Sequence, residues 1–293
     1  IRDYSDVRSR LAGADVVIHC AAMKHVGVCE RSPRQAIETN VVGLQNVINA
    51  CVEQKVSRLL FTSSDKAVNP TNVMGTSKLM GERLITAASS LSKDTICAST
   101  RFGNVLGSSG SVLPIFYSQL LAGKPLSVTD RNMSRFIMTI EQAADLVLES
   151  LYEMKGGEVF VTKMPVVNIF KLGEALWSLM KKRELPVSDV FEHDIIGVKP
   201  GEKLYEELMT DEETRRTLEL PKYFAVLPAF RGFFHDVDYT YDEIISEQVV
   251  NPYVSSKEPE LDIPDIMRFI DEGGLLDDLT QDSLLTRHWP GDK

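Results

Sequence analysis

The sequence predicts an α/β protein with a doubly wound parallel sheet and a smaller second α/β domain. Three observations support this fold class. Short apolar segments alternate with segments of helical periodicity, and turn residues follow the apolar segments. The regular alternation ends after Gly103. Such alternation is typical of β-α-β units with parallel strands. With 293 residues, 43% of them hydrophobic, the chain can form a sizeable core.

The first predicted strand lies in ADVVIHCAA, residues 14–22, a continuous apolar run that ends in small residues. We expect this strand to be buried on both faces. A helix is predicted within residues 33–54, because apolar residues recur there at three- and four-residue spacing. The expected apolar stripe consists of Ile37, Val41, Leu44, Ile48 and Cys51.

Two further strands are predicted in SRLLFTSS, residues 57–64, and TICASTRFG, residues 95–103, with a helix between them at residues 76–90. Such β-α-β units have parallel strands that are joined by right-handed crossovers. Their ligands bind at the carboxyl ends of the strands. We therefore expect the functional loops to begin near Ala21, Ser64 and Gly103.

Beyond Gly103 the predicted elements are shorter and the sequence is rich in Gly and Ser. Short strands are predicted in residues 125–130, 158–163 and 190–196, and helices in residues 141–153 and 169–182. We expect a first domain of residues 1–103 and 137–155 and a second domain of residues 104–136 and 156–230. Residues 231–293 are acidic and turn-rich, and we interpret them as a solvated tail with peripheral helices or as an oligomer contact.

Composition excludes several functional classes. The formal net charge of −10 argues against a general nucleic-acid binder. The four cysteines lack CxxC spacing, so we expect buried thiols and neither a disulfide framework nor a metal site. No apolar run approaches the ~20 residues of a membrane-spanning helix, and the first residues resemble no signal peptide, which favours a cytoplasmic setting.

No Gly-rich turn of the GxGxxG or GxxGxxG type, which binds dinucleotides in doubly wound domains, occurs in the sequence. The chain starts within what reads as a later β-α unit. We expect an amino-terminally incomplete domain that lacks its first β-α units. A sheet without its first strands would expose an apolar edge.

Ser64, Asp65 and Lys66 follow the second predicted strand, where side chains can converge on a ligand. A carboxyl beside an amine in a partly dry cleft is a plausible acid–base couple, although the same residues are common in turns. Met74 and Lys78 follow at a spacing of four, on one face of a predicted helix. Lys78 could hold a ribose hydroxyl, whereas Met74 reads as a packing residue.

Six segments together resemble the NAD-dependent UDP-N-acetylglucosamine 4,6-dehydratases of the extended short-chain dehydrogenase/reductases, which have a Rossmann-like fold. Ser64, Met74 and Lys78 reproduce the Ser/Thr–Tyr–Lys spacing of that superfamily, apart from Met74. The resemblance extends from Ile1 to about Leu208 and weakens to about Pro228. The segments are AAMKHV (21–26), ETNVVG (38–43), SSDKAVNPTNVMGTSK (63–78), RFGNVLGSSGSVLP (101–114), SVTDRNMSRFIMTIEQA (127–143) and GVKPGEKLYEEL (197–208).

This resemblance implies an NAD-binding first domain and a sugar-nucleotide-binding second domain. Hydride transfer from C4 of the hexose would acidify C5, whose proton Lys66 would remove while Asp65 protonates the departing O6 hydroxyl. Ser64, Met74 and Lys78 complete the implied catalytic set.

The resemblance also implies binding residues for NAD and for a UDP-sugar. Ala21, Ala22 and Lys24 would border the cofactor, Lys78 would bind the nicotinamide ribose, and the backbone near Phe102 would bind the carboxamide. The sugar-nucleotide contacts would come from Asn104, Ser111, Arg135, Lys199, Glu202 and Lys203, among which Arg suits bidentate binding of phosphate.

Met74 departs from the commonest family pattern, because a Tyr there would accept the O4 proton and Met cannot. Lys78, or the couple of Asp65 and Lys66, could take over this role.

Inversion at C5 is favoured over retention. Two alternatives stay open: a UDP-hexose 4-epimerase, and a non-catalytic sugar-nucleotide-binding subunit. We also expect a homo-oligomer.

Overall fold

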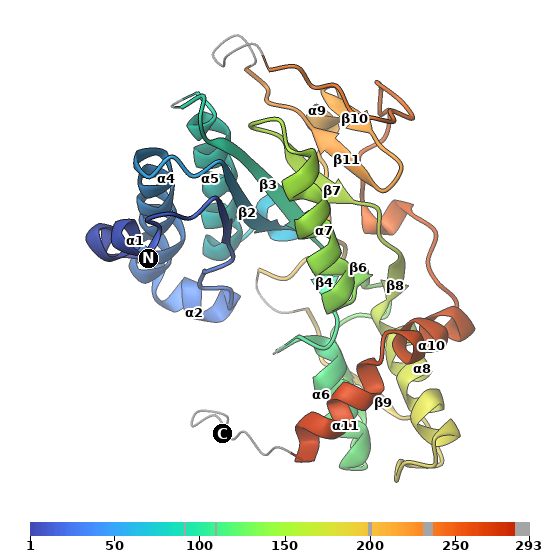
Figure 1. Cartoon of the computed structure of the whole chain (residues 1–293). Coiled ribbons are helices and arrows are strands. Elements are labelled where there is room, and N and C mark those ends of the chain that lie inside the picture. The colour runs from blue at the N-terminus through green and yellow to red at the C-terminus, as the bar shows by residue number, and fades with distance from the viewer. Residues whose placement is uncertain (91, 109, 199–200, 231–236, 285–293) are drawn as a thin grey trace. The chain divides into compact units, whose positions relative to one another are not determined.

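A six-stranded sheet organises the first of two structural units that the chain forms (Figure 1). The structure is a computed structural model that describes residues 1–90, 92–108, 110–198, 201–230 and 237–284. The first unit comprises residues 1–103, 143–163 and 206–257. The second comprises residues 104–142, residues 164–205 and the chain from Glu258 onward.

Four neighbouring strands of the first sheet are parallel, and two antiparallel strands extend it. In spatial order they are β1 (Val16–His19), β2 (Arg58–Ser64), β3 (Ile96–Phe102), β7 (Val159–Thr162), β11 (Tyr223–Val226) and β10 (Thr217–Glu219). Ser64 is paired with Phe102, so β2 and β3 end at the same level. The sequence prediction of a doubly wound parallel sheet is confirmed for β1, β2, β3 and β7, whereas the pairing of β11 with β7 is antiparallel.

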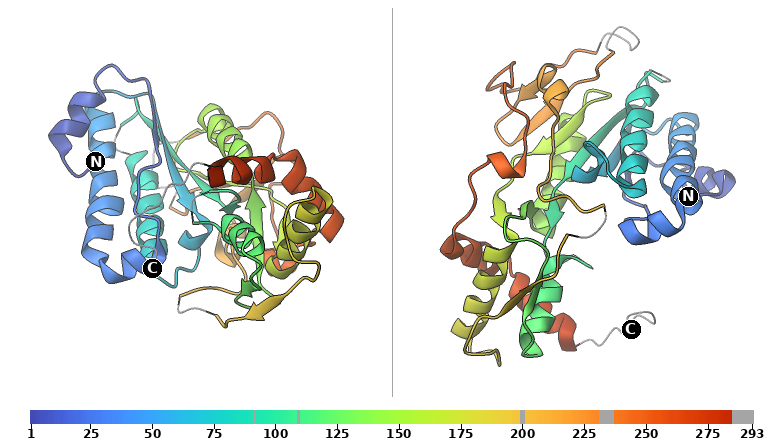
Figure 2. Two further views of the ribbon diagram at one scale, coloured as in Figure 1. Left: turned by 90° about the horizontal axis from the view of Figure 1, so that it is seen from below. Right: turned by 180° about the vertical axis from the view of Figure 1, so that it is seen from behind.

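Helices cover both faces of this sheet. Helices α4 (Gly43–Glu53) and α5 (Val73–Ala88) lie on one face, and α7 (Ile140–Glu153) lies on the other (Figure 2). Apolar side chains of α4, among them Leu44 and Ile48, pack with Leu59 and Phe61 of β2. The remaining elements of this unit are α1 (Tyr4–Arg10), α2 (Val26–Arg31), α3 (Pro33–Ala36), the π-helical turn η1 (Ile37–Val42), the 3₁₀ turn η2 (Asp65–Ala67), α9 (Asp211–Thr214) and the 3₁₀ turn η4 (Ser255–Lys257).

The second unit packs four helices with short strands around its own apolar core. Leu113, Phe116, Leu172 and Ile266 are among its buried residues. Its strands are β4 (Asn104–Val105), β6 (Ser134–Met138) and β8 (Val166–Asn168) in one sheet, and β5 (Leu126–Val128) with β9 (His193–Ile195) in another. Its helices are α6 (Val112–Leu121), α8 (Ile169–Lys182), α10 (Ile263–Glu272) and α11 (Leu275–Leu284).

The first strand differs from the expectation of burial on both faces. Val16 is 45% exposed and Ile18 is 42% exposed. The reason is that β1 is the edge strand of the sheet, so it has a paired neighbour on one side only. The predicted helical stripe also begins later than expected: Leu44, Ile48 and Cys51 are buried, but Ile37 is 51% exposed. The π-helical turn at 37–42 changes the helical register before α4 starts.

The unit boundaries differ from the expected domains in the carboxyl-terminal half. Residues 158–163 form β7 of the first sheet, and 206–230 contribute β10 and β11 to it, although both segments were expected in the second domain. Residues 237–257 belong to the first unit, and α10 packs against α8 in the second, so this region is no detached tail. The sequence of a short strand does not show which strand it pairs with. Its place in a sheet is decided by pairing with segments that are distant in the chain.

Within the described ranges, no helix has the length and apolar character needed to cross a membrane.

Candidate active site

Ser64, Asp65 and Lys66 lie together at the carboxyl end of β2, as the sequence predicts. Asp65 Oδ1 accepts hydrogen bonds from the Ser64 hydroxyl at 2.7 Å, the Lys66 backbone N–H at 2.8 Å and Lys66 Nζ at 2.9 Å. Asp65 is 1% exposed, and its Oδ2 has no hydrogen-bond partner among the described residues. A buried carboxyl is thus oriented through one oxygen, while its second oxygen keeps its hydrogen-bonding capacity for a proton or a ligand.

Met74 and Lys78 lie one turn apart near the start of α5, and both are buried. Lys78 Nζ donates to the carbonyl oxygen of Thr62 at 2.8 Å and lies 4.7 Å from the centre of the Phe61 ring. Burial lowers the pKa of Lys78 to about 8. A substantial fraction of Lys78 is therefore neutral near pH 8, where a lysine with the ordinary pKa of 10.5 is almost fully protonated. Met74 packs with Cys29, in keeping with its interpretation as an apolar packing residue.

Gly75 brings the two predicted parts of the site into contact. A Cβ atom at Gly75 would lie 2.2 Å from the carbonyl oxygen of Lys66, so any larger residue would force α5 away from η2. The same glycine donates its backbone N–H to the side chain of Asn72, which caps α5, at 2.8 Å. Nothing in the sequence marks Gly75 as part of the site. Its helical position gives no sign of how closely another backbone approaches.

The loop of residues 21–24, expected to border a cofactor, follows β1 and is anchored by Asn40. The Asn40 side chain accepts from the Met23 N–H at 2.8 Å and donates to the Met23 carbonyl at 3.0 Å. It also donates to the hydroxyl of Ser77 at 2.9 Å. This buried amide therefore ties the loop to α5. Asn40 lies in the segment ETNVVG, in which its role was not predicted from the sequence.

The residues expected to bind a sugar nucleotide lie in the second unit. Asn104 is in β4, and Ser111 is the residue that precedes α6. Asn104 Oδ1 and Ser111 Oγ are buried atoms that lack a hydrogen-bond partner in the part of the chain that is described. Both atoms can therefore accept or share a hydrogen bond with a ligand.

Arg135, expected to bind a diphosphate, makes backbone contacts within the second unit. Its guanidinium donates to the carbonyl oxygens of Ser134 and Lys203, both at 2.7 Å, and of Leu204 at 3.1 Å. Arg135 therefore holds the loop in which Glu202 and Lys203 lie, and both of these residues are partly exposed. Lys199, expected in the same group, lies outside the described residues.

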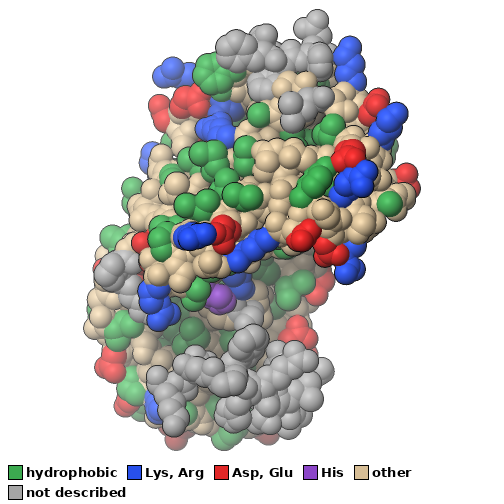
Figure 3. Space-filling model, turned by 90° about the vertical axis from the view of Figure 1, so that its left-hand side faces the viewer, with side chains coloured by type: hydrophobic (Ala, Val, Ile, Leu, Met, Phe, Trp, Pro, Cys, Tyr) green, Lys and Arg blue, Asp and Glu red, His purple; other side chains and the backbone are tan. Residues whose placement is uncertain are grey.

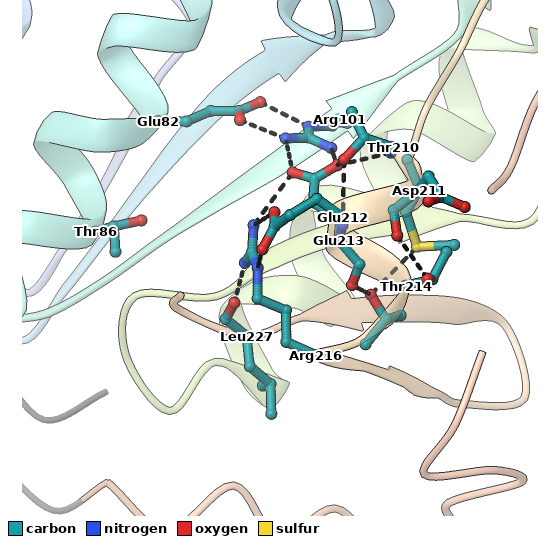
Figure 4. Close-up of polar contacts among 12 residues, drawn as sticks. Glu82, Thr86, Arg101, Thr210, Asp211, Glu212, Glu213, Thr214, Arg216 and Leu227 are labelled. Atoms are coloured by element: carbon teal, nitrogen blue, oxygen red, sulfur yellow. Dashed lines mark hydrogen bonds and ion pairs between the residues drawn. The ribbon is translucent and has the colours of Figure 1, made fainter. Parts of the chain in front are cut away.

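The first unit contains a buried cluster of charged side chains that was not predicted from the sequence (Figure 4). Arg101, 1% exposed, forms two hydrogen bonds with Glu82 at 2.7 and 2.8 Å and two with Glu213 at 2.7 and 2.9 Å. Burial alone would raise the pKa of Glu213, but Arg101 lowers it to about 2. Glu82 also accepts a hydrogen bond from Ser63 at 2.6 Å. The cluster thus joins β2, β3, α5 and α9 behind the candidate site.

Glu206 was also missed, although it lies in the quoted segment GVKPGEKLYEEL. Its Oε1 is 3.8 Å from Lys66 Nζ, and its side chain is 4% exposed. Lys66 Nζ consequently lies between two buried carboxylates, those of Asp65 and Glu206. The sequence could not reveal this, because 140 positions separate Glu206 from Lys66.

The other polar candidates have structural roles or form no site. His19 is buried and stacks on Phe61, and burial together with Lys78 lowers its pKa to about 4. Three of the four cysteines are buried, and Cys20 is exposed. Across the described ranges, no cluster of three His, Cys, Asp or Glu side chains could hold a metal ion.

Residues 1–228 match the family described as polysaccharide biosynthesis protein. A UDP-N-acetylglucosamine 4,6-dehydratase (inverting) from Campylobacter jejuni is 37% identical over 243 residues, which are 82% of this chain and 70% of that protein. A protein of Methanocaldococcus jannaschii, named as an uncharacterized membrane protein, is 43% identical over 78% of this chain and 69% of its own length. A UDP-glucose 4-epimerase from Rickettsia massiliae is 37% identical over 77% of this chain and 65% of its own length.

Two solved structures resemble the fold. Pen from Bacillus thuringiensis has a TM-score of 0.83 and 39% identity, with 94% of this chain and 80% of that chain covered. DesIV from Streptomyces venezuelae, a dTDP-glucose 4,6-dehydratase crystallised with NAD, has a TM-score of 0.61 and 20% identity, with coverage of 69% and 67%. At that identity, the second likeness concerns the fold alone.

Proposed function

The chain belongs to the polysaccharide biosynthesis protein family, and we propose that it is an NAD-dependent UDP-N-acetylglucosamine 4,6-dehydratase. The observation that carries the proposal is the buried carboxyl of Asp65, hydrogen-bonded to Lys66 at the carboxyl end of β2. A 4,6-dehydratase needs both an acid and a base beside the sugar, and this couple contains one of each. Similarity to the inverting dehydratase from Campylobacter jejuni supports the same assignment.

The residues at the ends of β1, β2 and β3 fit the nicotinamide half of NAD. Small side chains at Ala21 and Ala22 leave room beside the sheet, and the buried amine of Lys78 lies within reach of the same edge. Together with Lys24 and the backbone near Phe102, these residues would hold the cofactor. When bound, NAD⁺ supplies a hydride acceptor for C4 of the sugar and the corresponding donor for C6.

The elimination step falls to Asp65 and Lys66. Lys66 Nζ takes the proton from C5, and the electrons of the broken C–H bond form the double bond between C5 and C6. The bond between C6 and O6 breaks, and O6 takes a proton from Asp65 and leaves as water. Ser64 orients Asp65 through its hydrogen bond to Oδ1.

Removal of the O4 proton falls to Lys78 in this proposal. Met74 occupies the position of the usual Tyr and has no group that accepts a proton. The lowered pKa of Lys78, about 8, provides a neutral amine at mildly alkaline pH. This amine can act on O4 directly or through one water molecule.

Asn104, Ser111, Arg135, Lys199, Glu202 and Lys203 are the residues proposed to bind the UDP-sugar. Support comes from the buried, unpartnered oxygens of Asn104 and Ser111 among the described residues. Lys203 adds a partly exposed positive charge suited to a diphosphate.

The proposal is tested with the full-length protein, UDP-N-acetylglucosamine and NAD⁺, with proton NMR of the product. We expect a 4-keto-6-deoxy product that carries solvent deuterium at C5 in D₂O, with inverted configuration at that carbon. The substitution Asp65→Asn should abolish this product. Retention of the gluco configuration would contradict the inversion, and absence of the keto product would contradict the dehydratase.

A UDP-hexose 4-epimerase is the second candidate, supported by the similar protein from Rickettsia massiliae. An epimerase needs no acid for O6, so an Asp65→Asn variant that still interconverts C4 epimers would favour it. The third candidate, a non-catalytic sugar-nucleotide-binding subunit, requires that the full-length protein bind UDP-sugar without turnover.

A cytoplasmic homo-oligomer is part of the proposal. Ile37, Val42 and Met80, from η1 and α5, are each 47% to 51% exposed. Figure 3, which views the molecule from the left of Figure 1, shows hydrophobic side chains among charged ones on that face. Ile37 and Met80 line one pocket, and exposed apolar side chains grouped in this way favour a contact with a second copy. Sedimentation analysis of the full-length protein tests the oligomeric state.

A further inference from the structure

We infer that Glu206 is a positioning residue of the acid–base couple, which holds the Lys66 ammonium that forms when the C5 proton is removed. This role rests on the proposed dehydratase function. Asp65 cannot serve as the sole partner of that ammonium at the moment when it forms. The reason is that Asp65 must still carry the proton that it later gives to O6.

The geometry places one amine against two carboxyl groups. Lys66 Nζ is 2.9 Å from Asp65 Oδ1 and 3.8 Å from Glu206 Oε1. The Asp65 and Glu206 side chains are 1% and 4% exposed, whereas Lys66 is 30% exposed. The two acids are therefore covered by protein, and the amine reaches the surface from which a substrate can approach.

Asp65 and Glu206 have different roles in the elimination, because only Asp65 gives up a proton. Before the step, the couple consists of a protonated Asp65 and a neutral Lys66, beside a Glu206 carboxylate. After it, Lys66 holds the C5 proton and Asp65 has lost its proton to the departing water, so the net charge of the three groups is unchanged. Throughout the step Glu206 supplies a fixed negative charge within about 4 Å of the developing ammonium, which stabilises it.

Hydrogen bonds fix the backbone at Glu206 and at Leu208, two residues later in the chain. The Glu206 N–H donates to the Ser255 hydroxyl at 3.0 Å, and the Ser255 N–H donates to the Glu206 carbonyl at 2.9 Å. Two residues later, the carbonyl of Leu208 accepts a hydrogen bond from Arg101 at 2.9 Å. Arg101 belongs to the buried cluster of Figure 4, so the backbone that carries Glu206 is attached to the sheet. Because the backbone of Glu206 is fixed in this way, its carboxylate needs little reorganisation when charge appears beside it.

The test compares Glu206→Gln and Glu206→Asp with the matched control Glu207→Gln in the full-length, NAD-loaded protein. Glu207 is the next residue, and its carboxylate accepts from the Asn69 amide at 3.0 Å. Each variant is assayed for kcat, KM and the pH profile of kcat with UDP-N-acetylglucosamine. Thermal unfolding and NAD content are measured alongside to report whether each variant is folded and loaded.

For Glu206→Gln we expect kcat to fall about 10- to 100-fold with KM changed less than about two-fold. The acid limb of the pH profile should move about one pH unit lower, because a negative charge next to the base is lost. Glu206→Asp should restore part of kcat, and Glu207→Gln should resemble the wild type.

An unchanged kcat and pH profile in Glu206→Gln would overturn the inference. So would a loss of activity with an unmoved pH profile and no rescue by Asp, since that pattern indicates a purely structural role. If the wild type makes no 4-keto-6-deoxy product, the proposed function itself fails, and the role of Glu206 fails with it.

Discussion

Glu158 should make the stability of the first unit depend on pH. It is 0% exposed immediately before β7, and its carboxylate accepts hydrogen bonds from the backbone N–H groups of Lys155 and, at 2.6 Å, Gly156. Burial raises the pKa of Glu158 from 4.5 to about 7. The folded state therefore binds this proton more tightly than the unfolded state. Its contribution to stability is fully present below about pH 4.5 and is lost as the pH rises through 7.

The magnitude follows from the two pKa values. The difference between 4.5 and about 7 corresponds to roughly 3 kcal/mol, of which roughly 2 to 3 kcal/mol is lost between pH 5 and pH 8. The substitution Glu158→Gln removes this titration. It also loses one acceptor oxygen, which costs about 1 to 3 kcal/mol at every pH. The stability advantage of the wild type over Glu158→Gln should therefore shrink by roughly 2 to 3 kcal/mol from pH 5 to pH 8.

Urea unfolding at intervals from pH 5 to pH 8, followed by circular dichroism, measures this difference in the free energy of unfolding. Other titrating groups contribute equally to wild type and variant, so they cancel in the comparison. Glu141→Gln, at an exposed position of α7, is the matched control and should show a constant difference from the wild type. A difference between wild type and Glu158→Gln that stays constant within about 0.5 kcal/mol would refute the reasoning.

Two further predictions concern the candidate site. Lys78→Met, with NAD⁺ binding confirmed, should lower turnover about 100-fold and remove a rise of kcat with pH near 8, as the pKa of Lys78 implies; near-normal turnover would contradict its role at O4. Gly75→Ala should lower kcat and destabilise the protein by about 1 to 3 kcal/mol, because its Cβ would meet the Lys66 carbonyl oxygen at 2.2 Å. Gly27→Ala is the control, since a Cβ there meets no atom within 4 Å, and an equal effect of both substitutions would exclude the contact as the cause.

The group of polar residues at the end of β2 could be predicted from the sequence, because its members are close together in the chain. Ser64, Asp65 and Lys66 are consecutive, and Met74 and Lys78 lie one turn apart on the following helix. Hydrophobic periodicity located β2, β3 and α5, and the parallel order of strands placed these residues at one edge of the sheet.

The carboxyl-terminal half was harder to predict for a physical reason. Strands β7, β10 and β11 are three or four residues long and join the first sheet through partners far away in the chain. A short apolar segment can pair with any available edge strand of a sheet, so its hydrophobic periodicity does not predict which strand it pairs with. The expected boundary at residue 156 and the expected tail from residue 231 therefore differ from the observed units.

The sequence by itself determined the fold class, the family resemblance and the adjacency of Asp65 and Lys66, because each depends on neighbouring residues or on a repeated local pattern. Only the tertiary structure decided that Glu206 faces Lys66, that Gly75 lets α5 touch the turn of Asp65, and that Arg101 lies between two buried carboxylates. These contacts arise when distant segments pack together, and their energies depend on burial, which no single segment of sequence specifies.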